Sequence, residues 1–232
     1  MMKNVAIIGA SGAIGQAFID VFSQHKDINQ VFRFARSPQH DDDIALDLTD
    51  EDSITAAARQ IDCSLDYVIV ATGQLHDSDF TPEKSLKALS QKAFEHFFAV
   101  NTIGPALIIK AFSPLLTKTD RSVMALLSAR VGSITDNHLG GWYSYRASKA
   151  ALNMVIKTAS IELGRSNKKA SLIGLHPGTV DSALSKPFQA NIPKDKCFTP
   201  SFAVSQMMQV IDQIKVEDSG DCFAYDGKKI AP

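Results

Sequence analysis

Tyr145 and Lys149 are the two side chains whose types and spacing most directly indicate chemistry. They stand four residues apart in the run YSYRASK, residues 143–149. If this run is helical, the phenol and the ammonium lie on one face of the helix, one turn apart. A cation beside a phenol favours the phenolate, and each unit by which the pKa falls corresponds to roughly 1.4 kcal/mol. The spacing is the one that a tyrosine acting as general acid and base needs, but roughly a quarter of chains of this composition would contain it by chance, so the rest of the sequence has to support the interpretation.

Short apolar runs alternate with helical patterns along the whole chain. Runs typical of strands occupy residues 5–8, 31–34, 44–46, 67–70, 123–127, 171–175 and 222–225, and apolar residues recur at helical spacing over residues 13–22, 50–61, 91–116, 143–165 and 202–214. This alternation predicts an α/β fold, with about seven strands in a mostly parallel sheet that helices cover on both faces. Because no linker or repeat interrupts the pattern, we expect one domain over residues 1–232.

Composition and charge narrow the classes of partner. The chain has 232 residues, a formal net charge of −1 and no concentrated basic run, so we expect a small-molecule partner rather than nucleic acid or a membrane surface. Its three cysteines lack Cys-x-x-Cys spacing, which predicts reduced thiols and a cytoplasmic protein. No apolar run approaches 18 residues and the histidines lack ligand spacing, so neither a membrane span nor a metal site is expected.

A glycine-rich turn, GASGAIG, joins the first expected strand to the first expected helix. Glycines at such a turn let a pyrophosphate approach the backbone, and the helix N-terminus attracts its charge. The predicted contacts are Gly9, Ser11, Gly12, Ala13, Ile14 and Gly15. A plain turn is the alternative interpretation.

The end of the second strand predicts which dinucleotide is bound. An acidic residue there would bind the ribose 2′-hydroxyl of NAD, whereas an arginine accommodates the 2′-phosphate of NADP. This chain has Arg36 and Ser37 after Ala35 and no acid. The pattern favours NADP, unless Arg36 is only a solvated surface residue.

Together these features resemble the short-chain dehydrogenase/reductase family over essentially the whole chain. Asp47 and Leu48 match the pair that typically contacts adenine, and Asn101 matches the family's catalytic asparagine. Further matches, near the nicotinamide, are Pro177, Gly178, Thr179, Val180 and Ser182. The segments SARVGSI, residues 128–134, and GGWYSYRASK, residues 140–149, are similar to the branch of C-factor and sniffer-like carbonyl reductases.

The resemblance implies a doubly wound, Rossmann-type domain that transfers a hydride between NADPH and a carbonyl or secondary alcohol. Tyr145 would donate the proton, Lys149 would hold the ribose hydroxyls, and Asn101 would complete a proton relay to solvent. It also implies a homodimer or homotetramer. A rival hypothesis is a dinucleotide-binding regulatory or signalling protein with little catalysis.

Two positions depart from the family's pattern. Ala71, Thr72 and Gly73 stand where the family usually has the last three residues of Asn-Asn-Ala-Gly, although the turn at Gly73 is kept and all three are expected to contact the cofactor. The position of the usual catalytic serine, counted back from a glycine at 132, is Ala129. Ser128 is therefore the predicted partner of the developing alkoxide, with Ser133 as the alternative and no essential serine as a third possibility.

Gly104 and Pro105 interrupt the helical pattern just after Asn101. Pro105 has no N–H to donate to the carbonyl of residue 101, so we expect a kink there and a carbonyl open to a water or an ammonium. The alternative is a bend that serves packing only.

Residues 182–200 form a long segment after the sixth strand. Loops longer than about 15 residues are often lids. We expect this segment to cover the substrate with Phe188, Ile192 and Phe198, or else to dock on the body of the domain. Trp142 and Tyr143 are expected to wall the pocket or pack beside it, and His176 is expected to be structural.

Overall fold

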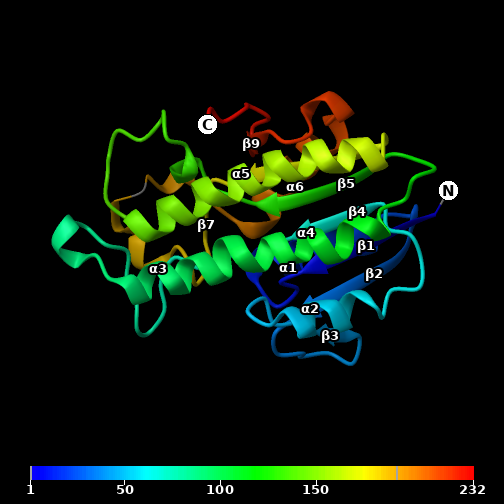
Figure 1. Cartoon of the computed structure of the whole chain (residues 1–232), viewed down its shortest axis with the longest axis horizontal. Helices are drawn as coiled ribbons and strands as arrows, with labels where there is room; N and C mark the ends of the chain where they lie inside the picture. Colours follow the sequence, from blue (N-terminus) through cyan, green and yellow to red (C-terminus); the bar gives the residue numbers. More distant parts are fainter. Residues whose placement is uncertain (1, 192) are drawn as a thin grey trace.

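The computed structural model describes residues 2–191 and 193–232 and shows one seven-stranded sheet between two layers of helices (Figure 1). The strands of this sheet are β1 (Lys3–Ile8), β2 (Ile28–Ala35), β3 (Asp43–Ala45), β4 (Tyr67–Val70), β5 (Ser122–Leu127), β6 (Ala170–His176) and β9 (Cys222–Ala224). The helices are α1 (Ala13–Gln24), α2 (Glu51–Ala58), α3 (Gln91–Phe98), α4 (Gly104–Phe112), α5 (Tyr143–Ser166) and α6 (Pro200–Gln213). The α/β fold class predicted from the sequence is confirmed.

The strand order is β3-β2-β1-β4-β5-β6-β9, and every neighbouring pair is parallel. The chain builds outward from β1 in one direction and then from β4 in the other. The carboxyl ends of β1 and β4 therefore flank the point where the winding reverses, which is where open sheets of this kind bind ligands.

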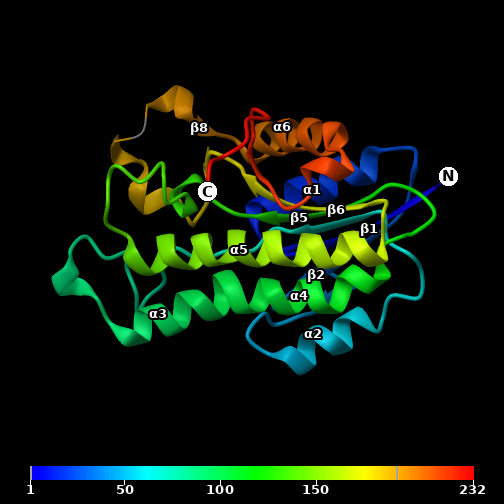
Figure 2. The same ribbon diagram turned by 45° about the horizontal axis from the view of Figure 1, so that its top comes forward.

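Helices cover both faces of the sheet (Figure 2). One apolar core joins the sheet to α1 and α6, and the other joins it to α2, α4 and α5. The central strands are buried along their whole length, as both-sided cover requires, and this explains their nearly continuous apolar sequences.

The helix expected over residues 91–116 is interrupted near its middle. Residues Ala99–Ile103 form a π-helical turn between α3 and α4, with the Gly104 N–H donating to the carbonyl of Ala99. The interruption predicted from Gly104 and Pro105 is thus present as a π turn, a feature that is frequent at functional sites.

The same helical run, Gln91–Leu115, is long and apolar enough to cross a membrane by length and composition alone. Core helices of globular domains meet this criterion too, and Ile108 and Phe112 of this run are completely buried against the sheet.

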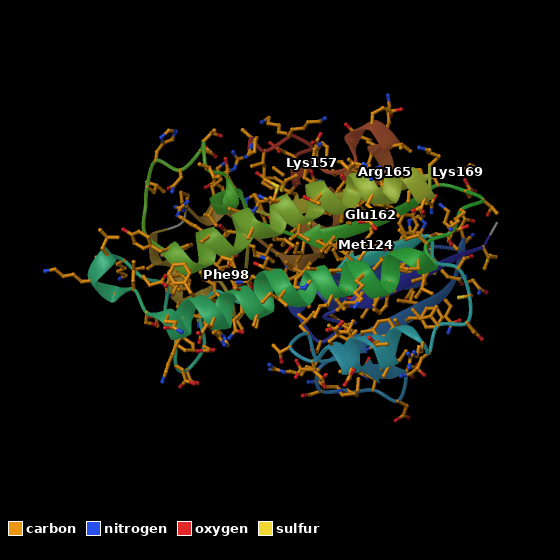
Figure 3. All side chains as sticks on the ribbon, viewed as in Figure 1. Phe98, Met124, Lys157, Glu162, Arg165 and Lys169 are labelled. Carbon is orange, nitrogen blue, oxygen red and sulfur yellow. The ribbon has the colours of Figure 1, made fainter. Side chains whose placement is uncertain are left out.

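Helix α5 has a buried face and an exposed face along its whole length. It buries Tyr145 and Lys149 near its start and Ile156 further along, whereas the charged side chains of Lys157 and Glu162 are exposed (Figure 3). The two candidate catalytic residues therefore lie on the face that packs against the rest of the domain.

Candidate active site

The glycine turn after β1 is held close against its neighbours. Gly9 has a left-handed backbone, with φ of +91°, and a Cβ there would lie 2.8 Å from the carbonyl oxygen of Ala71. A Cβ on Gly15 would overlap the carbonyl of Gly9. No side chain caps the N-terminus of α1 at Gly12, so the first N–H groups of this helix are available to an anion.

A cavity of about 510 Å³ opens at the carboxyl ends of the strands. Its lining includes most of the predicted site residues: Ser11, Gly12, Ala13, Ile14, Ala71, Thr72, Gly73, Ser128, Tyr145, Lys149, Pro177, Gly178, Thr179, Val180 and Ser182. It also includes residues that sequence reasoning missed, notably Leu75, Val131 and Leu184. Their apolar types give no signal in the sequence, because only the fold brings them to one wall.

The lining fits a phosphate-bearing dinucleotide. Among the described residues that line the cavity, none carries a carboxylate, and the one charged side chain is the cation of Lys149. Burial, and then the nearby Arg130, lower the pKa of His176 to about 4, so this lining ring is neutral at neutral pH. The buried hydroxyl of Thr72 has no partner within the described protein, which leaves a polar atom for a ligand beside the glycine turn.

The predicted adenosine contacts lie at the ends of β2 and β3, outside the cavity. Arg36 and Ser37 are exposed there. Asp47 accepts hydrogen bonds from the backbone and hydroxyl of Thr49, and these bonds, with a smaller contribution from Arg36, lower the pKa of its carboxyl. Leu48 packs on Gly104, where a Cβ would lie 2.6 Å from the Leu48 carbonyl oxygen.

Lys149 is a buried cation, 2% exposed, whose Nζ donates to the carbonyl oxygen of Leu127 at 2.9 Å. Burial lowers its pKa to about 8. Two glycines lie close against Lys149: a Cβ at Gly73 would lie 3.2 Å from Nζ, and a Cβ at Gly132 would lie 2.9 Å from the Lys149 carbonyl carbon.

Tyr145 lies in the same buried turn, but its titration differs from the expectation. Burial raises the pKa of its phenol to about 12, and the ammonium of Lys149 is bound to Leu127. The expectation that Lys149 lowers the pKa of Tyr145 is therefore not met in this structure. Among residues 2–191 and 193–232 the Tyr145 hydroxyl makes no hydrogen bond, which leaves it free to donate to a bound molecule.

Asn101 sits inside the π turn and is completely buried. Its Oδ1 accepts the Gln74 N–H at 2.8 Å, and its Nδ2 donates to the Gln74 carbonyl at 2.8 Å and to Ser148 Oγ at 3.2 Å. The side chain thus ties the loop after β4 to α5. A direct contact with Lys149 is not among its hydrogen bonds, and its part in a relay stays a prediction.

The two candidate serines that follow β5, Ser128 and Ser133, have different surroundings. Ser128 lines the cavity, but its hydroxyl donates to Asn153 Oδ1 at 2.6 Å. Ala129, by contrast, packs with Leu75 against Tyr145. Ser133 is directed elsewhere, towards Thr135 and the carbonyl of Pro232. The residue beside the phenol is therefore an alanine. This arrangement favours the third possibility, that no serine is essential.

The segment after β6 covers the cavity in part. Residues Lys186–Asn191 form a 3₁₀ segment, and its Phe188 ring lies 5.3 Å from Trp142 and 5.5 Å from His76. Phe198 instead belongs to β8 (Cys197–Phe198), pairs with β7 (Thr179–Val180), and packs on Tyr225. Ile192, which was expected to help cover the substrate, lies outside the described residues.

Comparison with known proteins identifies the family. Residues 3–193 match the family described as short chain dehydrogenase. The chain belongs to this family. The resemblance found in the sequence is thereby confirmed.

Relatives and solved structures agree with the family. An oxidoreductase of Schizosaccharomyces pombe is 27% identical over 97% of this chain and 96% of its own. The C-signal protein of Myxococcus xanthus is 35% identical over 57% of this chain and 75% of its own. The structure of the NADPH-bound carbonyl reductase from chicken fatty liver superposes with a TM-score of 0.86 at 24% identity, covering 100% of this chain and 99% of that one. Carbonyl reductase Sniffer of Drosophila melanogaster superposes with a TM-score of 0.86 at 21% identity, covering both chains completely.

The depressed pKa of Lys149 predicts a dependence of stability on pH. Between the folded pKa of about 8 and the ordinary lysine pKa of 10.5 the unfolded chain binds more protons at this site, so the free energy of unfolding should rise with pH across this window. Urea unfolding at several pH values should show wild type gaining roughly 3 kcal/mol relative to Lys149→Met from pH 8 to 10.5. Parallel profiles for the two proteins would contradict the burial of a titrating Lys149.

The bond between Ser128 and Asn153 predicts a modest catalytic effect for Ser128→Ala. Because the hydroxyl proton already has an acceptor, we expect kcat to fall less than tenfold, below the roughly 10²-fold typical of a lost oxyanion donor. Ser133→Ala, the matched control, should leave kcat unchanged. A loss near 10²-fold for Ser128→Ala would show that this hydroxyl exchanges Asn153 for the substrate.

Proposed function

We propose that this chain is an NADPH-dependent oxidoreductase that transfers a hydride between NADPH and a carbonyl or secondary alcohol. One observation carries the proposal: a buried phenol, with no hydrogen bond to the residues that the structure describes, faces a cavity together with a buried cation one helical turn away. A pure dinucleotide-binding module has no need of a phenol in this position. Family membership and the fold shared with carbonyl reductases support the same class of reaction.

In such a reaction some residues of the chain would bind NADPH and others would transfer the proton. Bound NADPH supplies the hydride. The first turn of α1 and its glycines would bind the pyrophosphate, and Lys149 would hold the ribose hydroxyls. Tyr145 would donate its proton to the carbonyl oxygen as the alkoxide develops.

The protonation state of Tyr145 favours the reductive direction at neutral pH. With a pKa of about 12 the phenol stays protonated, as a proton donor must. Alcohol oxidation needs the phenolate as base, so its rate should rise with pH. The Asn101 side chain, which joins the Gln74 backbone to Ser148, would support the relay that returns a proton to Tyr145.

The wall around Tyr145 favours a neutral, apolar carbonyl substrate. Leu75, Val131, Trp142 and Phe188 line or close this part of the cavity. No charged group other than Lys149 is present among the described lining residues to bind a carboxylate or an amine. We therefore propose that residues 182–191 cover an uncharged substrate, with Phe188 as the contact.

We also propose an oligomeric state and a cellular location. Exposed apolar side chains on the outer faces of the π turn and of α5, Ile103, Met154 and Ile161, support a homodimer or homotetramer. Three free cysteines agree with the predicted cytoplasmic location.

Replacement of Tyr145 by phenylalanine tests the reaction directly. Tyr145→Phe removes one hydroxyl and keeps the ring, so NADPH affinity should stay nearly constant while turnover falls by 10²- to 10⁴-fold. The assay is NADPH oxidation with a panel of aldehydes, ketones and quinones. If the variant keeps more than about a tenth of wild-type activity, Tyr145 is not the general acid. If wild type binds NADPH but oxidises it with no member of the panel, the regulatory alternative, which Ala129 and the C-signal relative favour, takes its place.

Cofactor preference tests the role of Arg36. A guanidinium can bind a 2′-phosphate through charge-assisted bonds worth about 1.5 to 3 kcal/mol, and Ala35 leaves the NAD ribose without an acid. We expect NADPH to bind at least tenfold more tightly than NADH, and the double variant Ala35→Asp/Arg36→Ile to reverse the order. Fluorescence titration of both cofactors measures this. Equal or tighter NADH binding by wild type would make Arg36 a surface charge only.

A further inference from the structure

Glu83 is a buried carboxylate that lies outside the cavity. It lies in the segment between β4 and α3, is 3% exposed, and does not line the cavity. Its neighbours belong instead to the start of α5, about 60 residues further along the chain. A carboxylate is rarely buried to this extent without a specific partner.

Two hydrogen bonds join Glu83 to the beginning of α5. Its main-chain carbonyl accepts the Trp142 N–H at 2.5 Å, and its carboxylate Oε2 accepts the Ser144 N–H at 3.2 Å. The first four N–H groups of a helix have no partner within the helix, and a side-chain oxygen from the N-cap residue normally binds one of them. Here the N-cap residue is Trp142, which supplies no such oxygen. The carboxylate of Glu83, which belongs to a segment distant in the sequence, accepts the hydrogen bond from the Ser144 N–H instead.

The start of α5 is also conformationally demanding. Trp142 has φ of 54° and ψ of 44°. Among the residues that the structure describes, no other non-glycine residue has a positive φ. A bulky residue in this left-handed region costs of order 1–3 kcal/mol and persists only where neighbours impose it. The hydrogen bond from Trp142 to Glu83 imposes it from one side, and Arg146, which donates to the carbonyls of Gly141 and Val131, holds the loop from the other.

This turn carries the reacting groups of the proposed reductase. Tyr145 is the third residue of α5, and the Trp142 ring lies 6.3 Å from the Tyr145 ring and 5.3 Å from Phe188. A shift of the first turn therefore moves the proton donor and the substrate wall together. The phosphate-binding turn lies on α1 and would be unaffected.

We infer that Glu83 is a positioning residue: its carboxylate hydrogen bond fixes the first turn of α5 and thereby the place of Tyr145 and Trp142. The inference rests on the proposed reduction of a carbonyl by NADPH. The position of the first turn of α5 should depend on the length of the Glu83 side chain rather than on its charge, because the group that it binds is a backbone N–H.

Three variants separate reach from charge. Glu83→Gln keeps an oxygen at the same distance and removes the charge, whereas Glu83→Asp keeps the charge and withdraws the oxygens by one methylene. Glu83→Ala removes both. Asp79→Ala, an exposed acidic residue of the same segment, is the matched control.

Turnover and fluorescence give independent readouts. A misplacement of about 1 Å can cost 10²-fold in rate, so Glu83→Ala and Glu83→Asp should lower kcat at least tenfold, with the NADPH affinity within threefold of wild type. Glu83→Gln and Asp79→Ala should stay within threefold in kcat. Trp142 is the single tryptophan of the chain, so its emission should shift to longer wavelength, with stronger acrylamide quenching, in the Ala and Asp variants alone.

The following results would overturn the inference. Glu83→Asp with unchanged kcat and emission would show that reach is irrelevant, and this comparison holds even if Glu83→Ala does not fold. Loss of NADPH affinity in parallel with kcat would make Glu83 a residue of general stability. If wild type reduces no carbonyl, the proposed function fails, but Trp142 emission still shows whether Glu83 orders this turn.

Discussion

The buried ammonium of Lys149 is the constraint on which the arrangement of the site depends. A charge that is only 2% exposed must be hydrogen-bonded, and the bond to the Leu127 carbonyl fixes α5 against the carboxyl end of β5. The helix can approach that closely because residue 132 is a glycine, where a Cβ would lie 2.9 Å from the Lys149 carbonyl carbon. The same contact brings Tyr145, one turn earlier, to the mouth of the cavity. A residue larger than glycine at position 132 would require α5 to move away from the segment that follows β5.

Burial also sets the electrostatics of the site. It raises the pKa of Tyr145 and lowers that of Lys149, so each group tends towards its neutral form. The phenol therefore stays protonated at neutral pH without help from the cation. The absence of carboxylates among the described lining residues leaves the cavity suited to an anionic dinucleotide and a neutral substrate. In the proposed reaction, Tyr145 rather than a serine would donate the hydrogen bond to the alkoxide, because the Ser128 hydroxyl is bound to Asn153.

Local sequence patterns were sufficient for the fold and for much of the site. Strand and helix periodicity predicted all seven strands of the parallel sheet, and the turn at Gly9 to Gly15 lies where the pattern placed it. The orientation of Ser128 could not be predicted, because side chains alternate at a strand end and only the neighbouring α5 shows that Asn153 takes its proton. The role of Glu83 at the start of α5 depends on a contact between distant segments, for which periodicity gives no signal.

Transfer of deuterium from NADPH to a carbonyl is the decisive test of the proposed reduction. Wild-type protein is incubated with NADPH stereospecifically deuterated at C4 of the nicotinamide, each diastereomer in turn, and with an uncharged aromatic aldehyde or ketone, and the alcohol is analysed by mass spectrometry. We expect one deuterium on the former carbonyl carbon with one of the two diastereomers, and almost no product with Tyr145→Phe. Tight NADPH binding without labelled alcohol from any carbonyl would contradict it.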